Sequence, residues 1–171
     1  VRNFKGGDVV ITISSGALVD TTGNKSVSKT YSFFKDVTRP VWDDNISEAI
    51  YNQTSKEYSF KLVGSDEYSL NSTSSVLSSS NVTIKVGGTA VSSSNLTFSS
   101  ATSKKKTKTF PVAIKNYTGG AIEITINKGA LVDTAGNVSL AKTYQTFIPD
   151  ITAPVWSYEN AIYNPDDVSY S

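Results

Sequence analysis

The feature that most constrains this chain is a long internal repeat. Residues 6–42 recur, with substitutions and one inserted residue, as residues 119–156. Conservation is strictest in Gly16-Ala17-Leu18-Val19-Asp20-Thr21, which returns unchanged as Gly129-Ala130-Leu131-Val132-Asp133-Thr134. Both copies close on a Pro-Val-Trp phrase, at residues 40–42 and 154–156. A repeat of this kind indicates an array of similar structural units.

The spacing of the two copies gives the size of the unit. Corresponding residues lie about 113 positions apart, which matches a small domain of about 100 residues rather than a solenoid unit of about 20 to 50. We therefore expect the C-terminal part of one repeat at 1–36, a complete repeat at 37–150 and the start of the next at 151–171. Proline in the two intervening segments predicts short, stiff joints.

Alternation of apolar and polar residues runs through the complete repeat. Such alternation is typical of strands with one buried face, and no window carries the 3.6-residue period of a helix. Gly87-Gly88 predicts a two-residue hairpin turn. Six to eight short strands in one small domain indicate an all-β fold, an antiparallel β-sandwich. The expected core residues are Phe60, Leu62, Ile84, Phe98, Phe110, Val112, Ile122 and Ile124.

Composition excludes several function classes. The chain has no Cys, His or Met, so disulfides, thiolate or imidazole metal sites and His-based catalytic triads are impossible. A net charge of +1 gives no electrostatic reason to bind nucleic acid. No segment approaches the ~18 apolar residues of a membrane helix. The adjacent acids Asp43-Asp44 and Asp166-Asp167 would point to opposite faces of a strand, so we expect no enzyme.

The Asp-x-x-Gly-Asn motif, at 20–24 and again at 133–137, allows two interpretations. The favoured one is a tight turn, in which the Asp side chain accepts backbone hydrogen bonds and Gly supplies a positive φ. The other is a calcium site, the one cofactor the chain suggests. Calcium takes six to eight oxygen ligands, so further acids from the joints would have to contribute. The candidate ligands are Asp20, Asp36, Asp43, Asp44, Asp133 and Asp150.

Two other groups of residues could bind ligands. Trp42 and Trp156 could stack on sugars, although packing beside the joint is the favoured interpretation. A cluster of lysines could bind an anionic polymer, but the pattern favours a solvated or edge-protecting role. Two of them, Lys106 and Lys108, are expected to lie beyond the covered end of the strand that follows. The cluster comprises Lys104, Lys105, Lys106 and Lys108.

The phrase from Gly129 to Asn137, followed by Asp150-Ile151-Thr152-Ala153-Pro154, resembles bacterial Ig-like (Big) repeats of surface proteins and adhesins. The first copy departs from it at Arg39. The resemblance implies an immunoglobulin-like sandwich on a bacterial cell surface, hence extracellular, without a catalytic site. The expected function is a non-enzymatic stalk or spacer of an adhesin or filament. The alternative is a module that binds a glycan or a host protein.

The expected partners follow from the incomplete repeats. Val9, Ile11 and Ile13 correspond to Ile122, Ile124 and Ile126, and should expose an apolar face unless other polypeptide covers them. That polypeptide would be a neighbouring repeat of the same long chain or a head-to-tail copy. We expect neither a nucleic-acid partner nor a membrane span in this segment.

Overall fold

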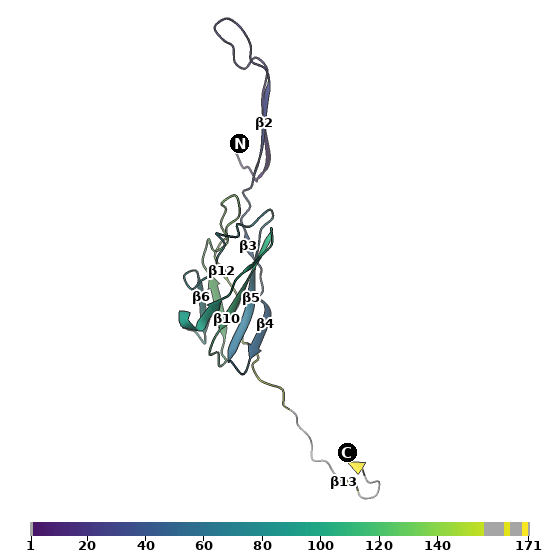
Figure 1. Ribbon diagram of the computed structural model, residues 1–171, viewed down its shortest axis with the longest axis vertical. Coiled ribbons are helices and arrows are strands. Elements are labelled where there is room, and N and C mark those ends of the chain that lie inside the picture. The colour runs from purple at the N-terminus through teal and green to yellow at the C-terminus, as the bar shows by residue number, and fades with distance from the viewer. Residues whose placement is uncertain (1, 156–162, 165–168, 171) are drawn as a thin grey trace.

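The computed structural model describes residues 2–155, together with the backbone of residues 163–164 and 169–170. Figure 1 shows a β-sandwich with a long β-hairpin projecting from one end. The chain leaves the sandwich at the opposite end, where Ile151 still packs against the core. None of the helical segments in the described residues is long and apolar enough to cross a membrane.

The first sheet of the sandwich is built around strand β5. Strands β3 and β4 both pair with β5, β5 pairs with β10, and β10 pairs with β8 and β9, all antiparallel. The bounds are β3 (Val41–Trp42), β4 (Ser47–Asn52), β5 (Glu57–Ser65), β8 (Leu96–Phe98), β9 (Thr102–Ser103) and β10 (Thr107–Ile114).

The second sheet has the order β12-β11-β6-β7 and is also antiparallel. Its strands are β6 (Val82–Val86), β7 (Thr89–Ala90), β11 (Ile122–Ile126) and β12 (Lys142–Thr143), and a single 3₁₀ turn, η1 (Ser93–Asn95), precedes β8. Gly87 and Gly88 form the β6–β7 turn with positive φ values of 57° and 82°, as expected. This strand order is that of immunoglobulin-type sheets. The all-β, immunoglobulin-like antiparallel sandwich is confirmed.

The core lies between the two sheets. Every second residue of β5 and β10 is buried, as the alternation predicted. Seven of the expected core residues are buried, and Phe98 is only half-buried. Trp42 also packs in the core, and the centroid of its ring lies 5.5 Å from the centroid of the Phe110 ring. Gly64 has no room for a side chain, because a Cβ there would lie 2.4 Å from Leu131.

The projecting hairpin consists of β1 (Gly7–Ile13) and β2 (Lys29–Lys35). The two strands pair antiparallel with each other, and no other described strand joins them. The hairpin does not fold back onto the sandwich, and its apolar side chains are largely exposed. At the other end of the chain, β13 (Tyr163–Asn164) pairs with β14 (Ser169–Tyr170). Trp156 lies outside the described residues.

The prediction for the lysine cluster is wrong at Lys108. Lys104, Lys105 and Lys106 are exposed, but Lys108 is only 7% exposed. Its ammonium group donates hydrogen bonds to the carbonyl oxygens of Ser72 and Ser75. The loop that contains Ser72 and Ser75 therefore folds back over β10 and covers a side chain that the strand alone would leave in solvent. Burial lowers the pKa of Lys108.

Candidate metal centre

Three aspartates from distant parts of the sequence meet where the hairpin joins the sandwich. Asp36 follows β2, Asp66 follows β5, and Asp133 lies in the loop between β11 and β12. One carboxylate oxygen from each lies within 4.8 Å of the other two. Their exposed fractions are only 6%, 6% and 1%. We call this group the aspartate cluster.

Local turns fix the direction of two of these side chains. The backbone N–H of Thr38 donates to Oδ1 of Asp36 over 2.8 Å. The N–H groups of Tyr68 and Ser69 donate to Oδ1 of Asp66 over 2.8 and 2.9 Å. Both are Asx-type turns, in which an aspartate accepts a hydrogen bond from a nearby backbone amide. In both turns the backbone amides donate to Oδ1, so the second oxygen, Oδ2, takes no part in the turn.

Asp133 is held more fully, by its own loop. The N–H groups of Ala135 and Asn137 donate to its Oδ1, each over 2.8 Å. The side-chain amide of Asn137 donates to Oδ2 over 2.6 Å. The same amide also lies 3.3 Å from the backbone oxygen of Asp36 and donates to it. Asn137 thus ties the loop of the sandwich to the segment that enters it.

Two oxygens of the cluster have no partner in the described chain. Oδ2 of Asp36 and Oδ2 of Asp66 are both buried and accept no hydrogen bond from any described residue. The ion pairs among the described residues involve other carboxylates, namely Glu48, Asp44 and Glu123. Buried carboxylate oxygens are normally hydrogen-bonded, paired or bound to metal, because removing a charge from water is costly. The two Oδ2 atoms are therefore buried acceptors that no described residue occupies.

A packing contact lies beside the cluster. The rings of Phe34 in β2 and Tyr68 in the sandwich meet edge to face, with their centroids 4.8 Å apart. Phe34 and Asp36 come from the hairpin side of the joint, whereas Tyr68, Asp66 and Asp133 come from the sandwich. The cluster thus bridges two structural units.

Calcium fits this donor set. It binds oxygen ligands at about 2.3–2.6 Å, so two ligands of one ion can lie up to about 5 Å apart. The spacing within the cluster is inside that limit. The two unpartnered Oδ2 atoms and the carboxylate of Asp133 would be the protein ligands, and water can complete the shell.

The structure brings together only two of the six aspartates that the sequence suggested as ligands. Asp36 and Asp133 belong to the cluster, while Asp43 and Asp150 are exposed and apart from it. Asp44 forms an ion pair with Lys142 over 2.6 Å. The hydrogen bond and the charge of Lys142 lower the pKa of Asp44.

Asp20, the counterpart of Asp133 in the first copy, is exposed in the loop between β1 and β2. Hydrogen bonds from Asn24 and Thr22 hold its pKa far below the usual range. The loop around Asp20 has the same hydrogen bonds as the loop around Asp133, but no described aspartate corresponding to Asp36 or Asp66 lies beside it.

Asp66 is the member of the aspartate cluster that the sequence did not predict. It lies in Ser65-Asp66-Glu67, outside the repeated segments, and directly follows the long strand β5. Because β5 pairs with β3, the end of β5 lies beside the entry of the chain into the sandwich. An acid directly after a strand that pairs with the first strand of the module was the available signal.

No family model matches the chain, and no curated protein matches it.

Proposed function

We propose that this chain is a segment of a spacer, built from tandem β-sandwich modules, whose joints are stiffened by calcium. The observation that carries the proposal is the aspartate cluster, which takes ligands from both sides of one joint and has two unpartnered buried oxygens. An ion bound there would hold Asp36 against Asp66 and Asp133. It would thereby restrain the hairpin relative to the sandwich.

The repeat supports a spacer rather than a single binding domain. The Asp-x-Thr-x-Pro phrase of a joint recurs at Asp150, whose Oδ1 accepts a hydrogen bond from Thr152 over 2.9 Å, just as Asp36 accepts one from Thr38. One joint therefore precedes the sandwich and a similar phrase follows it. Copies of a module separated by stiff joints extend the reach of whatever they carry.

The location on a bacterial surface, as part of an adhesin or filament, rests on the resemblance to Big repeats. Extracellular fluids hold far more free calcium than the cytosol, and extracellular calcium modules work with weak binding, at about 10⁻⁴–10⁻³ M. A site with three protein carboxylates and water suits such conditions. Antibodies against the chain should label intact producing cells, whereas labelling only after lysis would contradict a surface location.

Spin labels can test the stiffening directly. The chain has no cysteine, so Ser32→Cys in the hairpin and Ser94→Cys in the sandwich give two unique attachment sites. We expect calcium to narrow the distance distribution between the two labels, and EDTA to broaden it again. Identical distributions with and without calcium would overturn the proposal.

Two further variants assign that effect to the cluster. Asp66→Asn keeps an oxygen that can accept the turn hydrogen bonds but removes the charge, so it should abolish the narrowing. Asp43→Asn is the matched control, because Asp43 is an exposed acid outside the cluster, and it should leave the narrowing intact. A loss of narrowing in both variants would indicate a nonspecific effect of charge.

A further inference from the structure

Most asparagines of this chain belong to one kind of triplet. Eight of the 12 are followed, two residues later, by Ser or Thr with no Pro between. Ser and Thr make up about a quarter of the chain, so chance placement would give only about three such triplets. The Asn-x-Ser/Thr triplet is the acceptor sequence of N-linked glycosylation and lies on surface loops of secreted proteins. The excess makes these triplets candidate acceptors.

Hydrogen bonding divides the triplets, because the atom that carries a glycan is the side-chain nitrogen, Nδ2. In four of them Nδ2 already donates within the fold, and these are Asn24, Asn81, Asn116 and Asn137. Asn71 and Asn95 are half-buried. Asn45 and Asn52 are exposed, and no described residue accepts a hydrogen bond from the Nδ2 of either. These two are the accessible acceptors.

Asn52 ends β4 and presents its amide on a defined turn. Its Oδ1 accepts hydrogen bonds from the backbone N–H groups of Thr54 and Ser55, over 3.0 and 3.1 Å. This Asx turn holds the side chain by its oxygen, so Nδ2 takes no part in the turn. Thr54, the third residue of the triplet, is exposed as well. Both groups that a glycosyl transferase must reach are therefore on the surface.

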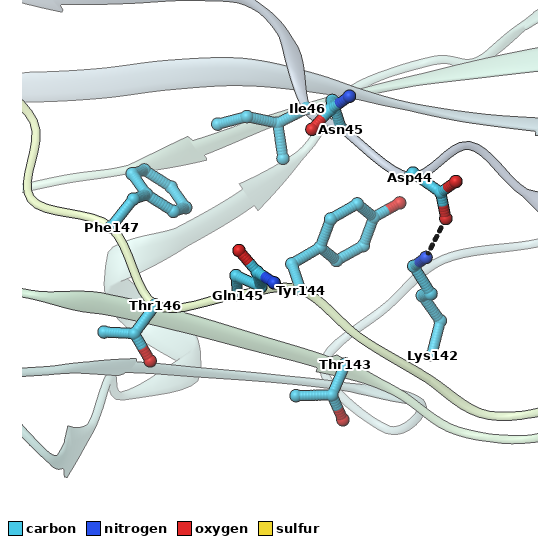
Figure 2. A pocket seen from close by; sticks show the side chains of 9 residues that line it. All are labelled: Asp44, Asn45, Ile46, Lys142, Thr143, Tyr144, Gln145, Thr146 and Phe147. Carbon is cyan, nitrogen blue, oxygen red and sulfur yellow. Dashed lines mark hydrogen bonds and ion pairs between the residues drawn. The ribbon is translucent and has the colours of Figure 1, made fainter.

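Asn45 lies in the connection between β3 and β4. Figure 2 shows its side chain beside Ile46, and the only interaction drawn there joins Asp44 to Lys142. Ser47, the third residue of this triplet, is exposed like Asn45 itself. The two accessible triplets therefore flank a single strand, β4.

Strand β4 is an open edge of the first sheet. Among the described strands it pairs only with β5, and the side chain of Ile50 is 64% exposed. An uncovered edge offers unpaired backbone groups to other chains, and proteins protect such edges with charges, with proline or with a cover. Tandem copies raise the local concentration of these edges. A bulky hydrophilic group at each end of β4 would supply the cover.

We propose that Asn45 and Asn52 carry N-linked glycans. Nδ2 attacks the anomeric carbon of a glycosyl diphosphate, which is the activated donor. The C–N bond forms as the bond from that carbon to the diphosphate oxygen breaks, and the diphosphate leaves with the bonding electrons. Nδ2 passes one proton to a base of the transferase, and nothing is oxidised or reduced. The proposal rests on the surface location proposed above, because such glycans belong to secreted proteins, but not on the calcium joint.

Peptide mass mapping of the chain isolated from its producing cells tests this proposal. Trypsin releases residues 36–56 as one peptide, because Pro40 protects the bond after Arg39. A second cleavage, after Glu48, separates the two asparagines. Each half should exceed its sequence mass by a whole number of sugar residues. Sequence masses for both halves would overturn the proposal.

Two hydroxyl variants assign the added mass on Asn52 to its triplet. Thr54→Ala should abolish it, and this variant keeps the turn, which uses the backbone N–H of residue 54. Ser55→Ala is the matched control, because Ser55 is an exposed neighbour outside the triplet, and it should retain the added mass. Added mass that survives Thr54→Ala would contradict transfer to this acceptor.

Sedimentation tests the protection of β4. The chain made in cells without the transferase should self-associate more strongly than the glycosylated chain, and Ile50→Lys should reverse that difference by charging the edge. Equal association of all three would contradict the protection. Antibody labelling of intact cells separates the two proposals, because labelled cells with unmodified peptides contradict the glycans and leave the surface spacer standing.

Discussion

The two copies of the repeated loop have the same backbone structure in different surroundings. In the hairpin, Asp20 accepts hydrogen bonds from Thr22, Asn24 and the Asn24 side chain, and Asp133 accepts the matching set in the sandwich. The bridge between Val19 and Lys25 likewise recurs between Val132 and Val138. Local sequence alone therefore builds this loop, whether or not anything packs on it.

Burial separates the two copies. Leu18 is 74% exposed, whereas its counterpart Leu131 is fully buried against Gly64. Asp20 stands in solvent, whereas Asp133 is 1% exposed and close to two other carboxylates. The comparison teaches that the turn is a property of the loop, while the aspartate cluster is a property of the joint.

The largest difference between the copies should appear on truncating the paired leucines. Leu131→Ala removes a fully buried side chain and should lower the free energy of unfolding of the sandwich by about 2–5 kcal/mol. Leu18→Ala removes an exposed side chain and should change it by less than about 0.5 kcal/mol. Urea denaturation followed by tryptophan fluorescence measures both. Equal losses would mean that the hairpin loop is covered in solution.

Alkaline pH should destabilise the buried copy through Tyr144. Burial, followed by the charges of Asp43 and Asp44, raises the pKa of Tyr144 above its usual 10.0. Above about pH 10 the unfolded chain ionises this tyrosine while the folded chain keeps its proton, so stability falls as the pH rises. The slope should reach about 1.4 kcal/mol per pH unit for each such tyrosine.

Urea midpoints between pH 8 and pH 11 measure that slope. Tyr144→Phe should flatten it in part, because burial also raises the pKa values of Tyr58 and Tyr117. An unchanged slope in the variant would show that Tyr144 is accessible to hydroxide, and that it is no better covered than the exposed Tyr31.

The smallest expected difference concerns a pair of serines. Ser139 accepts a hydrogen bond from the N–H of Leu131 over 3.1 Å, and Ser26 accepts one from Leu18 over 3.2 Å. Ser139→Ala should cost about 1 kcal/mol, because the buried amide loses its partner. Ser26→Ala should cost almost nothing, since water replaces the hydroxyl. If Ser26→Ala costs as much, the hairpin loop contributes to the stability of the sandwich.

The sequence predicted the features that rest on repeated motifs and on alternating polarity. Alternation along residues 58–62 and 122–126 identified strands and their buried faces, because the two sides of a strand differ in polarity. It failed at Lys108, where a loop distant in sequence covers the strand. Two of the three aspartates of the cluster were predictable, since Asp36 and Asp133 lie in recurring motifs. Asp66 was not, because only the pairing of β3 with β5 brings it to the joint.

Calorimetric titration of the whole chain with calcium chloride tests the central claim most directly. Asp20→Asn and Asp66→Asn form a matched pair, since the first alters the exposed loop and the second alters the cluster. We predict one bound calcium ion for the original chain and for Asp20→Asn, and none for Asp66→Asn at the same concentrations. An absence of binding by the original chain, or undiminished binding by Asp66→Asn, would contradict a calcium centre at Asp36, Asp66 and Asp133.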